Sequence, residues 1–159
     1  MSLTLEAFRA LDEIEIVSST NAKKQILKDN IENNILFNLL YWTYNPFYHF
    51  FMNKVELPDG VCHRDVNKYA IHIVEFKQIL GRLNVRNVTG NKAKDMVQNF
   101  LKRCDELEIK WYSRVLVRDL KCGISVTTIN RIYGDVIQVY PVALAENPDV
   151  RVYPPNFRI

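Results

Sequence analysis

The residues best suited to chemistry lie at positions 114–134, where cations and hydroxyls surround a glycine. Apolar residues follow helical spacing through the first part of this segment, and they predict a helix that keeps Arg114 and Arg118 exposed on a neighbouring face. Gly123 would end this helix, because glycine readily takes the left-handed conformation found just beyond a helix. Ser125 would then cap a second helix.

The start of that second helix, expected over residues 126–133, is suited to binding an anion. Backbone N–H groups in a first helical turn have no partner within the helix, and the helix dipole makes that end partly positive. A nucleic-acid phosphate fits this position because cations and hydroxyls flank it. The pattern therefore predicts a phosphate site, here called the Gly123 site, made of Arg118, Lys121, Gly123, Ser125 and Thr127. The alternative is an ordinary helical hairpin, in which glycine and serine only join two helices.

A second glycine has similar surroundings earlier in the chain. Thr89 or Asn91 can cap a helix over residues 92–104, in a basic part of the sequence. Gly90, Asn91 and Lys92 form a second predicted phosphate site, here called the Gly90 site. Two such sites would hold two stretches of nucleic-acid backbone, whereas two ordinary helix starts are the alternative.

Positive charge is concentrated in the part of the chain that holds both glycines. Residues 61–131 contain fourteen Lys and Arg against seven Asp and Glu, while residues 1–60 contain five against eight. Residues 132–159 contain two against three, which gives the net charge of +3. A localised basic surface is the electrostatic feature expected of a duplex-binding protein. Solvated lysine-rich helices are the alternative.

Hydrophobic periodicity predicts an all-α fold in one compact module. A chain of 159 residues, 48% of them hydrophobic, can bury a substantial core. The aromatic residues between Tyr41 and Phe51 are assigned to core packing and not to a base-stacking surface, because no lysine or arginine lies between Lys28 and Lys54. The expected helices span residues 5–17, 21–30, 35–44, 47–54, 66–83, 92–104, 114–122 and 126–133.

Other kinds of chemistry are not indicated. The three cysteines have no C-x-x-C spacing, so neither a disulfide framework nor a zinc site is predicted. The sequence has no glycine-rich phosphate loop, no Ser/His/Asp arrangement and no carboxylate cluster suited to a metal. We therefore expect no catalytic residue and no metal ligand. Without a secretory signal or an apolar run of bilayer length, the chain is expected to be cytoplasmic and not in a membrane.

Three motifs, in order, resemble the N-terminal DNA-binding domain of ATP-dependent DNA ligases, with the phage enzymes of the T-even type most similar. The first is NAKKQILKDN at residues 21–30, with the apolar segment that follows it. The second is RNVTGNKA at residues 86–93, and the third is RDLKCGISVTTINRIYG at residues 118–134. The two predicted phosphate sites lie within the second and third motifs.

The resemblance implies a division of the chain into two parts. Residues 1–139 would form a compact multi-helix DNA-binding domain, and residues 140–159 a linker and the start of a nucleotidyltransferase domain that is otherwise absent. Prolines at positions 141, 148, 154 and 155 favour an extended tether in this second part.

The resemblance also implies a function in DNA replication and repair. The full ligase would use ATP and Mg²⁺ to seal nicks between a 5′-phosphate and a 3′-hydroxyl. This fragment lacks the K-x-D-G adenylation motif, since Leu57 stands where Asp59-Gly60 would need a lysine, so it should be inactive alone and bind no cofactor. Its expected partner is nicked double-stranded DNA, bound without sequence preference in a bacterial or phage-infected cell. A replication clamp is a further candidate partner, and a monomer is expected.

Two other functions compete with this interpretation. The first is a non-catalytic replication accessory or protein-interaction module with the same helical fold. The second is a small regulator that reads base sequence. A recognition helix rich in Arg, Asn and Gln would be expected there, and residues 126–133 offer only Asn130 and Arg131.

Overall fold

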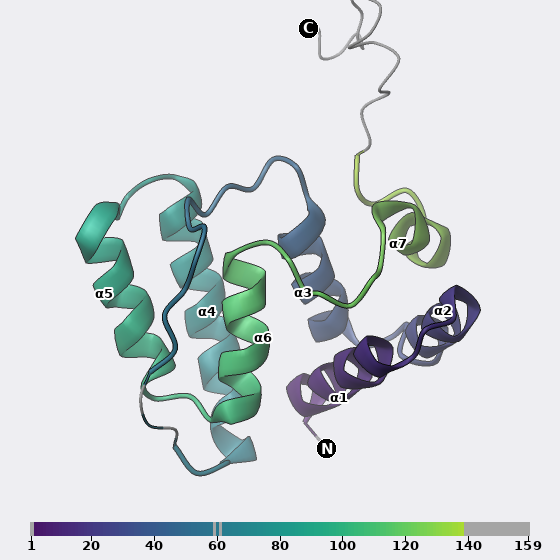
Figure 1. Cartoon of the computed structure of the whole chain (residues 1–159), viewed down its shortest axis with the longest axis horizontal. Helices are drawn as coiled ribbons and strands as arrows, with labels where there is room; N and C mark the ends of the chain where they lie inside the picture. The colour runs from purple at the N-terminus through teal and green to yellow at the C-terminus, as the bar shows by residue number, and fades with distance from the viewer. Residues whose placement is uncertain (1, 59, 61, 139–159) are drawn as a thin grey trace, which may run out of the picture.

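The computed structural model describes residues 2–58, 60 and 62–138, and this part of the chain is all-α (Figure 1). The predicted fold class is therefore confirmed, while the predicted linker at residues 140–159 lies outside the described residues. The helices are α1 (Leu3–Ile16), α2 (Thr20–Asp29), α3 (Asn34–Tyr44), the short 3-10 helix η1 (Val66–Lys68), α4 (Tyr69–Asn84), α5 (Gly90–Leu101), α6 (Glu106–Leu116) and α7 (Val126–Tyr133).

Polar side chains set most of the helix starts. Ser2, Ser19 and Asn33 each accept a hydrogen bond from a backbone N–H in the first turn of α1, α2 and α3. At α6, Asp105 and Glu108 form a capping box, in which each side chain accepts from the backbone N–H of the other residue. Such caps satisfy donors that the helix itself leaves free, and each contributes about 1 kcal/mol.

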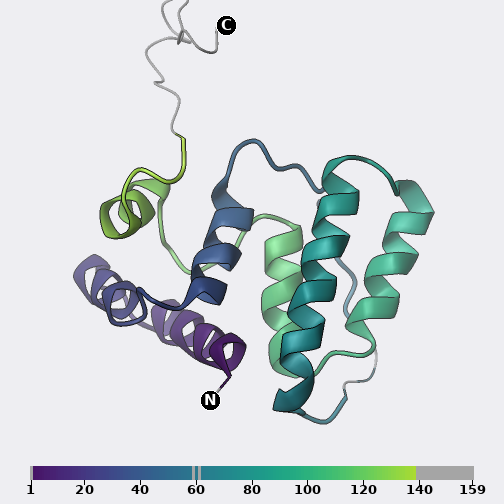
Figure 2. The ribbon, with the colours of Figure 1, turned by 180° about the vertical axis from the view of Figure 1, so that it is seen from behind.

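The helices pack into two groups that share one core. Helices α4, α5 and α6 lie side by side at one end of the molecule, and α2 and α7 lie at the other (Figures 1 and 2). Helix α1 contacts α2, α3, α4 and α6, so it joins the two groups. Helix α7 packs against α2, which brings the last described helix next to the first motif of the sequence.

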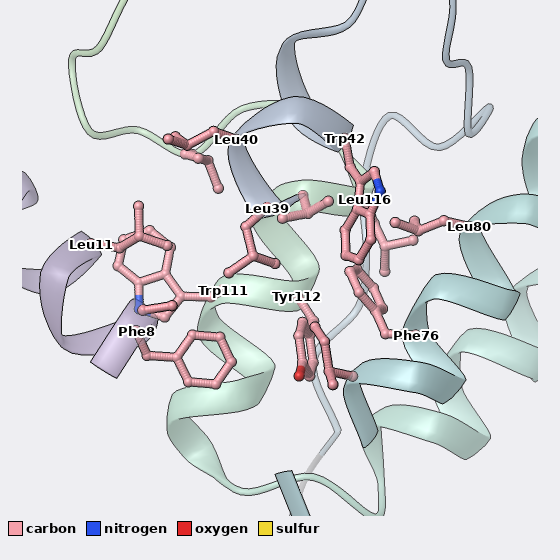
Figure 3. Packing of buried hydrophobic residues seen from close by; sticks show 14 of the residues in the cluster. Phe8, Leu11, Leu39, Leu40, Trp42, Phe76, Leu80, Trp111, Tyr112 and Leu116 are labelled. Carbon is pink, nitrogen blue, oxygen red and sulfur yellow. The ribbon is translucent and has the colours of Figure 1, made fainter. Parts of the chain in front are cut away.

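Aromatic side chains fill the centre of the core (Figure 3). Tyr112 of α6 stacks on Phe76 of α4, with ring centroids 4.3 Å apart, and Phe8 of α1 meets the Tyr112 ring edge-on at 5.5 Å. Trp111 is fully buried, and its indole N–H donates to Asp12. These contacts hold α6 in place, and α6 carries the chain into the Gly123 site.

Two predicted helices are wrong, and Arg118 explains part of both errors. The helix expected over residues 47–54 does not form, because carbonyls before and within this segment accept hydrogen bonds from the Arg118 guanidinium. The helix expected over residues 114–122 begins earlier and ends at Leu116, because the capping box sets its start at Glu106. Arg118 then takes a left-handed conformation, with φ of +60°.

Candidate nucleic-acid interface

The two loops that contain the predicted sites are built on the same plan. Helices α4 and α6 each end with an arginine in the left-handed conformation, Arg86 (φ +55°) and Arg118 (φ +60°). The same two backbone hydrogen bonds close both helix ends, from Arg86 and Asn87 in one and from Arg118 and Asp119 in the other. A glycine with positive φ follows in each loop, and then the next helix starts. Glycine is the usual residue at such a helix end, so an arginine in both loops is uncommon.

At the Gly123 site, the phosphate-binding role of Arg118 stays a prediction, but the prediction that it is exposed is wrong, because Arg118 is half-buried. Its three guanidinium nitrogens donate to the backbone carbonyls of Thr43 (3.0 Å), Tyr48 (2.6 Å) and Asn45 (2.5 Å). Burial lowers the pKa of the guanidinium from its usual value. Arg118 therefore anchors the loop to the segment that follows α3.

Arg114, also predicted to be exposed, is held internally as well. Its guanidinium lies 2.7 Å from the Glu15 carboxylate and donates to the carbonyl of Leu120. Lys110 donates to the other oxygen of Glu15 at 2.8 Å. These hydrogen bonds, first that of Lys110 and then that of Arg114, hold the pKa of Glu15 below its usual value. The ion pairs tie α1 to α6 and to the loop before α7.

Lys23 of α2 belongs to the Gly123 site, although the sequence did not indicate it as a site residue. Its ammonium donates to the carbonyl of Cys122 at 2.8 Å, and it lies so close to Gly123 that a Cβ there would be 2.5 Å from the nitrogen. Gly123 itself has a φ of +69°. The positive φ favours glycine at this position, and an added Cβ would force the flexible end of the Lys23 side chain to move. The signal available was that Lys23 lies in the NAKKQILKDN motif.

The remaining residues of the Gly123 site lie at the start of α7. Ser125 is the N-cap, as predicted, and its hydroxyl accepts from the backbone N–H of Thr128 at 3.2 Å. Lys121, Ser125 and Thr127 are all exposed. In the described part of the chain Lys121 forms no ion pair. Within the described residues, Lys121 is therefore a cation without a carboxylate partner at this site, whereas Lys23 of α2 is bound to the carbonyl of Cys122.

The Gly90 site is more open. Helix α5 begins at Gly90, two residues earlier than predicted, and it ends at Leu101 instead of residue 104. Thr89 occupies the N-cap position, yet its side chain makes no capping hydrogen bond. Gly90, Asn91 and Lys92 are all exposed, and a Cβ at Gly90 would meet nothing within 4 Å.

The sequence also did not indicate a contact between Arg86 and Phe51 near the Gly90 site. Arg86 places its guanidinium carbon 4.2 Å from the centroid of the Phe51 ring, which is 60% exposed. The core-packing prediction for the aromatic residues between Tyr41 and Phe51 is therefore wrong for Phe51, because a cation distant in the sequence lies beside its ring. Phe51 precedes α4 in the sequence and Arg86 follows it, so only the fold brings the two residues together.

The Gly123 site extends from the end of α6, in the middle of the molecule, to the start of α7, which lies on the other side of the molecule from α5 (Figure 1). Figures 1 and 2 show the starts of α5 and α7 far apart, with the α4, α6 and α3 helices between them. The fold does not bring the two sites together into one pocket. A ligand that contacts both must be extended, as a nucleic-acid duplex is.

A family model described as "DNA ligase N terminus" matches residues 48–134, which is more than half of the chain. The chain belongs to the DNA ligase N-terminal family. The matched residues include both predicted sites and the Phe51–Arg86 pair. The resemblance found in the sequence motifs is therefore confirmed.

Relatives of this ligase N-terminal domain are found among phage enzymes. The chain is 27% identical over 142 residues to the DNA ligases of Enterobacteria phage T4 and Enterobacteria phage T6. The match covers 89% of this chain but only 28% of each relative, so the chain spans less than a third of their length.

Two solved structures share the fold of this ligase N-terminal domain. The structure named Pmar-Lig_PreS3 aligns with a TM-score of 0.69 at 24% identity, over 79% of this chain and 29% of that one. The structure named Pmar-Lig_Pre. aligns with a TM-score of 0.70 at 23% identity, over 82% and 30%. At these identities the likeness establishes the helical fold.

One buried cluster in the ligase N-terminal domain contains groups that can bind metals. His72, Cys104 and Glu108 place one possible ligand atom each within 4.8 Å of one another. His72 Nδ1 lies 2.8 Å from Glu108, whose other oxygen accepts from the Asp105 backbone in the capping box. Burial raises the pKa of the Cys104 thiol well above its usual value, which keeps it protonated. We therefore interpret the cluster as a polar contact between α4, α6 and the segment that joins α5 to α6.

Two further observations bear on what the ligase N-terminal domain does. Both ends of the Asn130 side-chain amide are bonded to the backbone of Ile137, at 2.9 Å each, so this side chain is not free to read a base. This weakens the prediction of a base-reading regulator. Among the described residues, no helix is long and apolar enough to cross a membrane.

Proposed function

We propose that this chain binds nicked double-stranded DNA by its sugar-phosphate backbone, without sequence preference, as part of an ATP-dependent DNA ligase. The full enzyme would join a 5′-phosphate to a 3′-hydroxyl. The family supports the ligase assignment, and the charge distribution supports a polyanionic partner.

The observation that carries this proposal is the repeated loop plan. Each loop begins with a left-handed arginine and leads to a glycine with an exposed lysine nearby, which is Lys121 before Gly123 in one loop and Lys92 in the first turn of α5 after the other. The two helices that follow these loops, α5 and α7, lie at opposite sides of the molecule (Figure 1). Contacts to two separate stretches of backbone fix a duplex in position and carry no sequence information.

ATP and Mg²⁺ would be bound by other parts of the full ligase. Mg²⁺ prefers oxygen ligands in octahedral geometry. The His72–Cys104–Glu108 cluster offers a protonated thiol, and both of its carboxylate oxygens are already hydrogen-bonded. The chain also lacks the K-x-D-G motif. Among the described residues this cluster does not fit Mg²⁺, and the proposed role of the chain is to hold the DNA.

The proposal is tested by measuring the affinity of the chain for nicked and intact duplexes of several unrelated sequences. We expect similar affinities across sequences, and a large loss in the triple variant Lys92→Ala, Lys121→Ala, Ser125→Ala. The matched control is Lys68→Ala with Lys77→Ala, which removes the same charge from exposed positions of η1 and α4. Equal losses in the triple variant and the control would show that net charge, and not the two sites, determines binding.

A protein-interaction role is the second candidate, because α4 exposes apolar side chains on one face. Ile71 is 66% exposed and Val74 is 56% exposed, on the helix that faces the viewer in Figure 2. Exposed apolar surface of this kind is common at protein contacts. The same DNA-binding measurement, made at physiological salt, separates the two functions, because an interaction module would not bind duplex DNA tightly there.

A further inference from the structure

A cavity of about 480 Å³ lies beside the Gly90 site, between the segment after α3 and the loop that joins α4 to α5. Its lining includes Phe51 and Lys54 from the first segment, Arg86 and Thr89 from the loop, and Gly90 and Lys94 from the first part of α5. These residues come from parts of the sequence that are far apart. The cavity is therefore a product of the fold, and no sequence motif marks it.

The Phe51 ring is held out into solvent at the edge of this cavity. The ring is 60% exposed, whereas its neighbour Phe50 is 2% exposed and belongs to the core. Phe51 has a φ of +59°, a conformation that is rare for a bulky side chain. Both the exposed apolar surface and the backbone strain cost free energy, and such features gather at ligand-binding positions.

Cations surround the ring. Arg86 covers part of it, at 4.2 Å from the centroid, and Lys54 and Lys94 also line the cavity. No acidic side chain lines the cavity among the residues that the structure describes. None of these three cations pairs with a carboxylate in the described part of the chain. The cavity thus combines an apolar ring with positive charges that no carboxylate neutralises among the described residues. Such a surface is complementary to a ligand that has apolar surface between negative groups.

We propose that Phe51 is a DNA-contacting residue whose ring packs against a deoxyribose of the duplex, while Lys54 and Lys94 bind the phosphates on either side. A sugar flanked by two phosphates has the required alternation of apolar surface and negative charge. With duplex DNA as the ligand, a sugar contact is favoured over base stacking, because the ring can reach a sugar edge without any base being unstacked, which would cost a few kcal/mol. The proposal rests on the DNA-binding function proposed above, and it adds a contact that is not ionic.

The test compares Phe51→Gly with Phe51→Tyr, using nicked duplex DNA at several salt concentrations. Glycine accepts the left-handed backbone better than phenylalanine, so Phe51→Gly removes the ring without adding strain to the fold. We expect about a tenfold loss of affinity, as for the burial of part of an aromatic ring, with no change in the dependence on salt. Phe51→Tyr should restore affinity to within about twofold. Lys94→Ala should instead lower the magnitude of the slope of the log association constant against log salt concentration by about one.

Each result decides between named alternatives. Ile71→Ala, which removes an equally exposed apolar side chain from α4, is the control and should bind as the wild type does. If Phe51→Gly binds within twofold of wild type, the Phe51 proposal is wrong while the proposed function stands. If the variant loses more affinity for a single strand than for the duplex, the ring stacks on a base and the sugar contact is wrong. If the wild type binds no DNA, the proposed function fails and this inference fails with it.

Discussion

The loops before α5 and before α7 have the same backbone design but use their arginines in opposite ways. Arg118 turns inward and donates to three backbone carbonyls, so it holds the fold together. Arg86 turns outward and lies over the exposed ring of Phe51. A basic residue in a motif that resembles a DNA-binding one can therefore hold the fold together instead of standing free for a ligand. The backbone plan fixes where the arginine lies, and its neighbours decide what it binds.

The two loops also differ in how firmly they are attached. The loop before α7 is held by Arg114, Arg118 and Lys23, and Ser125 caps the helix that follows. The loop before α5 has no side-chain cap, and no ion pair joins it to the rest of the described chain. We infer that the Gly123 site is pre-formed, whereas the Gly90 site can adjust to the DNA.

The largest difference in stability between the two loops is expected when Arg86 or Arg118 is replaced by glycine, a residue that readily adopts the left-handed backbone conformation. Arg118→Gly should lower the free energy of unfolding by about 3 kcal/mol, because three carbonyls lose a charged donor. Arg86→Gly should change it by less than about 1 kcal/mol, because relief of backbone strain offsets the lost ring contact. Urea unfolding followed by the fluorescence of Trp42 and Trp111 measures both. Equal effects would show that the two arginines have the same role.

Replacing the two glycines by alanine should also destabilise the protein more in the loop before α7 than at the start of α5. Gly123→Ala should cost about 2 kcal/mol, because the left-handed conformation is strained and the new Cβ displaces Lys23 from its carbonyl. Gly90→Ala should cost about 1 kcal/mol, from the backbone conformation alone, since nothing lies within 4 Å of the added atom. Thermal unfolding of both variants gives the comparison. A greater cost at Gly90 would contradict the idea that the Gly123 loop is the more firmly held.

Acid should loosen the firmly held loop first. The pKa of Glu15 is lower in the folded protein than its usual value, because Lys110 and Arg114 donate to the carboxylate. Its stabilising contribution is therefore complete above the usual glutamate pKa and is lost as the pH falls through the lowered one. Glu15→Gln should cost about 1.5 kcal/mol at neutral pH and almost nothing in acid. The free energy of unfolding is measured for wild type and variant across this pH range. A difference between the two that stays constant down to low pH would disprove this role.

The smallest expected difference lies in the two helix caps. Ser125→Ala removes a hydroxyl that accepts from the backbone of Thr128, and should cost about 1 kcal/mol. Thr89→Ala removes a side chain that makes no capping hydrogen bond, and should cost less than about 0.5 kcal/mol. Chemical unfolding of the two variants resolves this difference. A cost at Thr89 as large as that at Ser125 would mean that both starts are capped in solution.

Local patterns predicted local structure well, and long-range contacts account for the errors. The cap at Ser125 and the glycines at positions 90 and 123 follow from residue types and spacing alone. The inward turn of Arg118 could not be predicted, because its three acceptors lie about 70 residues earlier in the chain. The same limit applies to the Phe51–Arg86 pair. The phosphate-binding roles of both sites stay predictions.

The most direct test of the two-site account is the salt dependence of binding to nicked duplex DNA. Wild type, Lys92→Ala, Lys121→Ala and the double variant are compared across a range of salt concentrations. If each lysine neutralises one phosphate, each single change should lower the magnitude of the slope of log K against log salt by about one, and the double change by about two. An unchanged slope in the double variant would contradict the account, because neither site would then contact the DNA backbone.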